Sequence, residues 1–262
     1  MAFATLNGIQ VHYRDEGDPD GAPVVFLNSL GTTLHVWDLI LPHLPKGLRI
    51  IRADMRGHGD TEVTAAPYSM GQLVRDTESL LMHLTVKDAL VVGLSIGGMI
   101  AQGLAVKRLD LVRAFVLSNT AAKIGSPKMW DDRVEVAQTE GLDALTETTM
   151  TRWFSRDFLA RPELPHWRAM FESTSVDGYA GCCAAIKGTD FYTPTASLRL
   201  PTLGIAGTED GATPPDLVRE TVELIPGARM ELLRRTGHLP CVENPTEYGA
   251  LLTDFMKEIG HV

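Results

Sequence analysis

The sequence has few cysteines and no run of basic residues. Its 262 residues include three cysteines, Cys182, Cys183 and Cys241, and none of them has the spacing of metal ligands. We therefore expect no metal site and interpret the cysteines as small buried residues of a protein from a reducing compartment. The formal net charge is −9. Because nucleic acids need a basic face on the protein, this charge argues against a nucleic-acid partner.

Long apolar runs and a targeting leader are also missing. No stretch approaches the length that spans a bilayer, and residues 1–8 lack the charged and apolar regions of a secretory signal. These absences predict a cytoplasmic protein that does not interact with membranes. Hydrophobic residues make up 44% and charged residues 22%, which is typical of a folded domain. The length fits one large domain or one domain with an insertion.

Short apolar runs rich in Val, Ile and Leu predict strands at residues 23–28, 49–54, 89–94, 113–118, 202–207 and 230–235. Near-continuous apolar strands are typical of a parallel sheet that is covered on both faces. Helical stretches at 69–84, 98–108, 214–225 and 245–259 lie between or after these runs, and Asn7-Gly8 predicts a hairpin turn within residues 2–15. The pattern predicts an α/β fold with a mostly parallel sheet and helices on both faces.

The alternation stops between about residues 122 and 195, where four amphipathic stretches occur without a strand. Ser126-Pro127 predicts a helix start and Asp177 a second N-cap, whereas Gly141 and Gly188 predict helix ends. We interpret residues 122–195 as a helical cap. It would be inserted between the two parts of one α/β core, residues 1–121 and 196–262.

One serine lies in a glycine-rich turn between a predicted strand and a predicted helix. The sequence there is Gly93-Leu94-Ser95-Ile96-Gly97. A strained strand-to-helix turn exposes such a serine at the C-terminal edge of the sheet, and flanking glycines avoid clashes across the turn. Ser95 is therefore a candidate nucleophile. The alternative is a serine that only caps the helix.

A serine nucleophile needs a base, and the base needs an acid that orients it. Asp210 and His238 follow the last two predicted strands, and the chain order Ser, Asp, His accompanies Gly-x-Ser-x-Gly turns. Both side chains would lie at the edge of the sheet where Ser95 lies. Glu209 is a competing acid, a turn carboxylate is the alternative for Asp210, and a surface loop residue is the alternative for His238.

An oxyanion formed by attack of Ser95 needs two N–H donors that are already in place. One belongs to the residue after the nucleophile, Ile96, and the other is expected in the loop after the first buried strand. Within that loop, Asn28-Ser29-Leu30-Gly31, we assign the second donor to Leu30. Gly31 would serve the turn itself.

These motifs, together with Asp-Met-Arg-Gly-His-Gly-Asp-Thr at residues 54–61, resemble the α/β-hydrolase superfamily along the whole chain. Serine at position 95 departs from the aspartate of epoxide hydrolases and haloalkane dehalogenases, which disfavours those activities. Asn28-Ser29 and the segments 93–105, 117–125, 129–136, 151–163 and 178–191 are similar to those of the 3-oxoadipate enol-lactonases. These enzymes serve the protocatechuate branch of the β-ketoadipate pathway in aromatic catabolism.

The resemblance implies hydrolysis of a small anionic lactone, 3-oxoadipate enol-lactone, to 3-oxoadipate. Ser95, His238 and Asp210 would act as a triad through an acyl-enzyme, with no cofactor. A carboxylesterase, a cofactor-free haloperoxidase and a C–C bond hydrolase are alternatives that use the same triad. A noncatalytic ligand-binding member of the superfamily is a further alternative.

The predicted cap contains one cation in an apolar stripe. On a helix over residues 127–140, Trp130, Arg133, Val134 and Ala137 share one face. Since the lactone carries a carboxylate, Arg133 is a candidate to bind it and Trp130 to form a wall of the site. Alternatively, Arg133 pairs with Glu135 or Asp157, or reaches water. Arg152-Trp153 is a secondary candidate pair, with packing inside the cap as its alternative.

Overall fold

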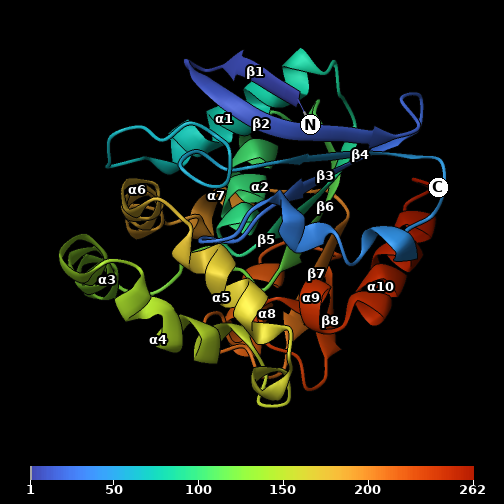
Figure 1. Ribbon diagram of the computed structural model, residues 1–262. Helices are drawn as coiled ribbons and strands as arrows, with labels where there is room; N and C mark the ends of the chain where they lie inside the picture. Colours follow the sequence, from blue (N-terminus) through green and yellow to red (C-terminus); the bar gives the residue numbers. More distant parts are fainter. Residues whose placement is uncertain (1) are drawn as a thin grey trace.

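A computed structural model describes residues 2–262 and shows one eight-stranded sheet (Figure 1). The strand order is β1-β2-β4-β3-β5-β6-β7-β8. The strands are β1 (Ala2–Leu6), β2 (Ile9–Gly17), β3 (Ala22–Leu27), β4 (Leu48–Ala53), β5 (Ala89–Leu94), β6 (Val112–Ser118), β7 (Thr202–Gly207) and β8 (Arg229–Leu233). From β4 to β8 in this order all neighbours are parallel, whereas β2 pairs antiparallel with both β1 and β4. The expected mostly parallel sheet is confirmed.

The expected hairpin is present at the edge of the sheet. Leu6 pairs with Ile9, and the turn between them has positive φ at Asn7 (48°) and Gly8 (80°). These are the angles that an Asn-Gly turn adopts with little strain, which is why this dipeptide predicts hairpins well.

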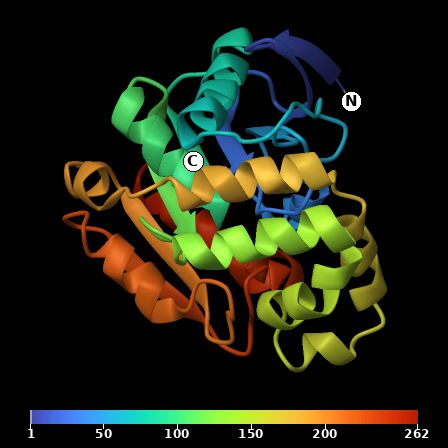
Figure 2. The ribbon, with the colours of Figure 1, turned by 90° about the vertical axis from the view of Figure 1, so that its left-hand side faces the viewer.

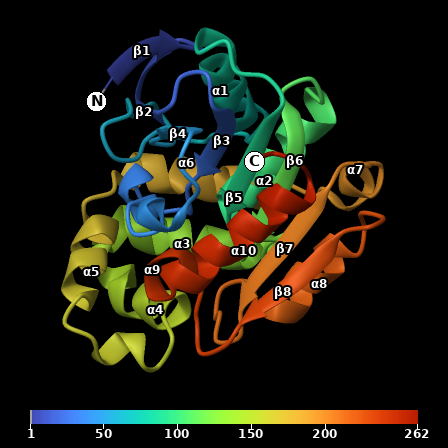
Figure 3. The ribbon, with the colours of Figure 1, turned by 90° about the vertical axis from the view of Figure 1, so that its right-hand side faces the viewer.

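Helices cover both faces of the sheet. α1 (Met70–His83), α2 (Ile96–Lys107) and α8 (Pro215–Val222) cover one face. The short helices η1 (Leu34–Trp37), η2 (Leu41–His43) and α9 (Pro240–Glu243) and the longer α10 (Pro245–Glu258) cover the other face (Figure 3). No helix among residues 2–262 combines the length and the apolar composition that a membrane crossing requires.

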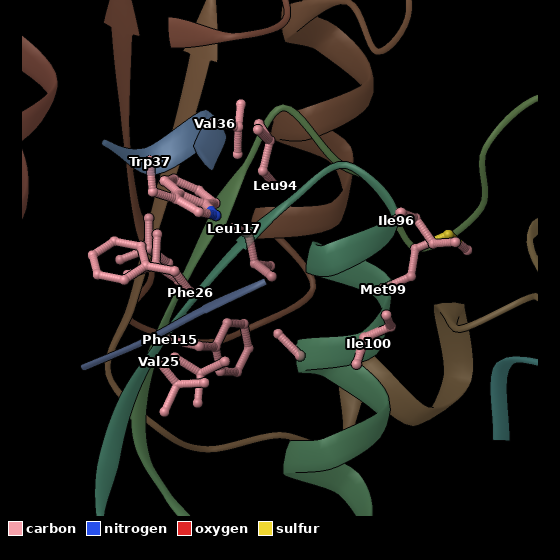
Figure 4. Close-up of a cluster of buried hydrophobic side chains, with 14 of the residues drawn as sticks. Val25, Phe26, Val36, Trp37, Leu94, Ile96, Met99, Ile100, Phe115 and Leu117 are labelled. Carbon is pink, nitrogen blue, oxygen red and sulfur yellow. The ribbon is translucent and has the colours of Figure 1, made fainter. Parts of the chain in front are cut away.

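The central strands are buried on both faces, which is why their sequences are continuous apolar runs. Every residue of β5 and of β7 is buried, because each strand has neighbours on both edges and helices on both faces. Figure 4 shows Phe26 and Trp37 on one side of the strands and Met99 and Ile100 of α2 on the other. The Trp37 indole N–H, which burial would otherwise leave unpaired, donates to Asn28 Oδ1 at 2.8 Å.

Between β6 and β7 the chain forms helices and no strand, and these helices lie over one end of the sheet (Figures 1 and 2). They are α3 (Pro127–Glu140), α4 (Asp143–Trp153), η3 (Phe158–Ala160), α5 (Leu164–Glu172), α6 (Val176–Lys187) and α7 (Tyr192–Ala196). We call this segment, residues 122–195, the cap. The last helix of this segment, α7, also packs against α2 of the core. The exact boundary between cap and core therefore remains a prediction.

The helix boundaries of the cap follow the expected signals with one correction. Ser126 caps α3 by accepting the Met129 N–H, and Gly141 ends this helix with φ 85°. Gly188 ends α6 as expected. The predicted N-cap at Asp177 is wrong, because Ser175 caps α6 by accepting the Gly178 N–H, and Asp177 lies in the first turn. Its negative charge is favourable there because the helix N-terminus is partially positive.

Candidate active site

Ser95 lies in the sharp turn between β5 and α2. Its backbone has φ 59° and ψ −119°, a sparsely populated conformation for a residue with a side chain. The flanking glycines are needed because the chain is crowded at this turn. A Cβ on Gly93 would lie 2.5 Å from Gly97 O, and a Cβ on Gly97 would lie 2.2 Å from Leu27 O. The turn therefore requires the Gly-x-Ser-x-Gly pattern in order to form.

His238 and Asp210 come together at the same edge of the sheet, in the loops after β8 and β7. Nδ1 of His238 lies 2.9 Å from Asp210 Oδ2, and both side chains are buried. A carboxylate can only accept, so Nδ1 carries the proton and Nε2 is free to act as a base. Of the two acids considered, the structure places Asp210 against the histidine. The carboxylate of Glu209 instead accepts the Arg156 N–H.

The surroundings of Asp210 favour its ionised form. Burial alone would raise its pKa, but the charge and hydrogen bond of His238, with donors from Asn119 and Thr213, hold the pKa of this carboxyl below its ordinary value. Asn119 Nδ2 donates at 2.8 Å and Thr213 Oγ1 also at 2.8 Å. A negative charge is thus maintained next to the His238 ring.

The base and the nucleophile line one pocket, without a direct hydrogen bond between them in this structure. Nε2 of His238 has its hydrogen-bond contact with Ser29 Oγ, at 3.4 Å. Ser29, Ser95 and His238 all line the same pocket. Contacts between a base and its nucleophile are often loose without substrate and tighten when it binds. The sequence offers Ser29 only as part of the Asn28-Ser29 resemblance and gives no sign of this contact, because Ser29 lies 209 positions before His238 in the chain.

The two expected oxyanion donors lie next to this pocket. Leu30 lines it, and its N–H donates to no acceptor among the described residues. Ile96 is the first residue of α2, where an N–H group has no partner inside the helix. The Ile96 N–H lies at a helix N-terminus, which carries partial positive charge, whereas the Leu30 N–H is a loop donor without a partner within residues 2–262. Both N–H groups are therefore suited to a developing negative charge.

The cap closes the pocket with apolar and cationic side chains. Trp130 and Trp153 line it together with Arg133 and Arg152. The Trp130 indole N–H donates to Ile124 O at 2.7 Å, so the indole offers the pocket mainly an apolar surface. Arg152, the secondary candidate for which packing inside the cap was the alternative, lines the pocket, and its Nε donates to Gly211 O of the core.

Arg133 has neutral partners only. Its guanidinium donates to Tyr179 OH at 2.6 and 3.0 Å and to Thr149 Oγ1 at 3.0 Å. No carboxylate of residues 2–262 lies within ion-pair distance, so the alternative pairings with Glu135 and Asp157 are wrong. Burial and the nearby positive charge of Arg133 lower the pKa of Arg152. Neither arginine forms an ion pair with another side chain of residues 2–262, so the pocket holds two neighbouring positive charges.

The cysteines take no part in this chemistry. All three are free and buried, as expected. Burial raises the pKa of the Cys183 thiol to about 12, so it stays protonated and packs as an apolar group.

Comparisons with known proteins identify the family of the chain. The model of the alpha/beta hydrolase fold family matches residues 22–245. The chain is 31% identical to 3-oxoadipate enol-lactonase 2 of Acinetobacter baylyi, over 97% of this chain and 95% of that protein. It is also 29% identical to 2-hydroxymuconate semialdehyde hydrolase of a Pseudomonas species, over 96% of this chain and 92% of that one.

Among solved structures, the enol-lactonase from Burkholderia xenovorans superposes with a TM-score of 0.94 at 36% identity, covering 98% of this chain and all of that chain. The likeness thus includes the cap as well as the sheet. The serine turn, the buried Asp–His pair and the matching family model lead to one conclusion: the chain belongs to the α/β-hydrolase family.

Proposed function

We propose that this hydrolase opens 3-oxoadipate enol-lactone to give 3-oxoadipate. The observation that carries the proposal is the unneutralised Arg133 in the pocket that Ser95 and His238 also line. A cation held only by neutral hydroxyl groups favours an anionic ligand, because a carboxylate would complete its hydrogen bonds and balance its charge. The likeness to enol-lactonases supports a lactone as that ligand.

The proposed reaction is acyl transfer to Ser95. His238 Nε2 takes the Ser95 proton while Oγ attacks the lactone carbonyl, and the N–H groups of Leu30 and Ile96 stabilise the oxyanion. The ring C–O bond then breaks, and the enol oxygen leaves with a proton from His238. An enolate is a better leaving group than an alkoxide, and ketonisation of the enol makes the ring opening hard to reverse.

Hydrolysis of the acyl-enzyme completes the cycle. His238 takes a proton from a water molecule, the resulting hydroxide attacks the acyl carbonyl, and the Ser95 Oγ–C bond breaks as Ser95 regains a proton. The product is a dicarboxylate, because ring opening adds a second carboxylate to the one that the lactone already carries. The residues assigned here account for each step of the reaction, and we propose that it needs no cofactor.

The first test follows the loss of ultraviolet absorbance of freshly prepared enol-lactone, with the Ser95→Ala variant as the blank. We expect rapid loss with the wild-type protein, 3-oxoadipate as the product, and turnover lower by several orders of magnitude in the variant. Lactone loss no faster than in the blank would discard the lactonase assignment. Turnover of p-nitrophenyl acetate in the same preparation would then indicate an esterase, whereas a noncatalytic ligand-binding protein would turn over neither compound.

A further inference from the structure

The segment Asp54–Thr61, which we call the motif loop, holds the loop that carries the second oxyanion donor. Asn28 Nδ2 donates to Ala53 O at 2.8 Å, just before the motif loop, and the Leu34 N–H donates to Asp54 Oδ1 at 2.7 Å. Between these two anchors, the Gly31 N–H donates to His58 Nε2 at 3.0 Å. The donor loop, residues 28–34, is thus bound at its start, middle and end.

These bonds fix a tight turn around Leu30. The Thr32 N–H donates to Ser29 O at 3.2 Å, and Gly31 has φ 76°, the value that a type II turn requires at its third residue. The Leu30 N–H shares its peptide plane with Ser29 C=O and points the opposite way. The next peptide plane contains the Gly31 N–H, and His58 holds that plane. Both peptide planes that flank Leu30 are therefore anchored.

The protonation of His58 follows from its two contacts. The Gly31 N–H can only donate, so Nε2 must be unprotonated, and Nδ1 carries the proton toward Arg56 O at 3.2 Å. His58 is buried, and burial lowers its pKa to about 4. The neutral ring with an acceptor at Nε2 therefore predominates at neutral pH.

The motif loop is itself held by the cap and by α1. Arg56 forms a two-pronged ion pair with Asp76 of α1, at 2.7 and 2.8 Å. Gly57 lies directly against Gly178 of α6, since a Cβ on Gly178 would be 2.0 Å from Gly57 O. His58 thus projects from a rigid support toward the donor loop.

We propose that His58 is a positioning residue for the oxyanion hole: through the Gly31 N–H it holds the donor turn in the form that directs the Leu30 N–H at the reacting carbonyl. Its role rests on the proposed acyl-transfer chemistry of Ser95 and does not depend on which ester or lactone is the substrate. Loss of the acceptor lets the turn change its peptide orientation. The donor is then misdirected, although it remains present.

Two amide variants form a matched pair for the test. In His58→Gln the side-chain amide can place its oxygen near the position of Nε2, whereas in His58→Asn the shorter amide reaches only the position of Nδ1. We expect kcat to fall about 10- to 100-fold in His58→Asn, part of the 10²- to 10³-fold that complete loss of an oxyanion donor costs. In His58→Gln we expect kcat within about 3-fold of the wild type, because the amide oxygen can still accept the Gly31 N–H and keep the donor in place.

Three further readouts separate positioning from folding. Both variants should bind 3-oxoadipate with the affinity of the wild type, and their thermal midpoints should agree with each other. The rate at which a fluorophosphonate labels Ser95 should follow kcat, because the phosphonyl oxygen occupies the same hole. Equal kcat in the two variants would overturn the proposal. So would a loss of kcat that is fully explained by weaker binding of 3-oxoadipate or by a smaller folded fraction.

Measuring kcat on both the enol-lactone and p-nitrophenyl acetate keeps this inference separate from the proposed function. If the ester reacts and the lactone does not, the lactonase assignment fails and the ratio of the two variants on the ester still decides the role of His58. If neither compound reacts, the labelling rates of Ser95 decide it.

Discussion

At the scale of single residues, Asp210 and Glu209 are adjacent acids with different contacts. The carboxylate of Asp210 is buried and holds Nδ1 of His238, whereas Glu209 is exposed. Asp210→Asn should lower kcat by about 10⁴-fold, because an amide can hold the histidine in the wrong tautomer and brings no charge to the imidazolium. The rate of p-nitrophenyl acetate hydrolysis measures this loss.

Glu209→Gln is the matched control, since it makes the same chemical change one residue away. Its kcat should stay within about 2-fold of the wild type, as is usual for an exposed substitution with little effect on structure. A large loss in the control together with a small loss in Asp210→Asn would reverse the assignment of the acid.

Arg133 and Arg152 differ from other arginines of the cap because they line the pocket. Arg133→Gln should raise KM for the anionic lactone about 10- to 100-fold, since hydrogen bonds to a charged group contribute about 1.5–3 kcal/mol. Hydrolysis of p-nitrophenyl acetate, which is neutral, should change little. Arg152→Gln should have a smaller effect in the same direction, because water screens this partly exposed charge.

Arg168→Gln is the control for the arginine variants, because Arg168 pairs with Glu147 on the outside of the cap. It should leave KM for both substrates unchanged. If Arg133→Gln instead loses activity equally on lactone and ester, Arg133 supports the fold and does not recognise a carboxylate.

At the scale of elements, the sequence predicts best the features whose signal lies in neighbouring residues. Strands such as β5 and β7 were predictable because burial on both faces leaves a continuous apolar run. The start of α6 was placed two residues too late, because Ser175 and Asp177 are both good N-caps and the sequence alone does not select between them.

Contacts between distant residues had no comparable local signal. The Ser29–His238 contact and the bond of Arg133 to Tyr179 join residues 209 and 46 positions apart. Each depends on how the cap and the loops are placed on the sheet. Asn119 was more accessible to prediction, because it directly follows β6 and so lies at the sheet edge where Ser95 and His238 were expected.

The close contact between α6 and the motif loop gives a prediction for an element as a whole. Gly178→Ala should destabilise the protein by about 1–3 kcal/mol or more, because the added methyl group would overlap Gly57 O and push the helix away. Thermal or urea unfolding measures the loss. Gly71→Ala, in α1, is the control: nothing lies within 4 Å of its added Cβ. This change should stabilise by about 0.5–1 kcal/mol; similar effects of the two substitutions would mean that α6 adjusts without cost.

At the scale of the whole molecule, the buried His58 links stability to pH. Burial lowers its pKa from the ordinary 6.5 to about 4 in the folded protein, so the unfolded chain binds a proton at a higher pH than the folded chain does. The resulting stability is present in full above about pH 6.5 and is lost as the pH falls toward about 4. A shift of this size corresponds to about 3 kcal/mol. The remote His261, whose pKa burial also lowers, adds a loss of the same sign.

A comparison of wild type with His58→Gln isolates the contribution of His58, because both proteins keep His261 and all carboxylates. The free energy of unfolding, measured by urea denaturation from pH 4 to pH 8, should fall more steeply with decreasing pH in the wild type than in the variant. The difference between the two curves should be constant above about pH 7 and should change by about 3 kcal/mol across the window. Parallel curves would mean that His58 takes up its proton equally easily in both states, and the neutral ring that we assign to the donor loop would then be wrong.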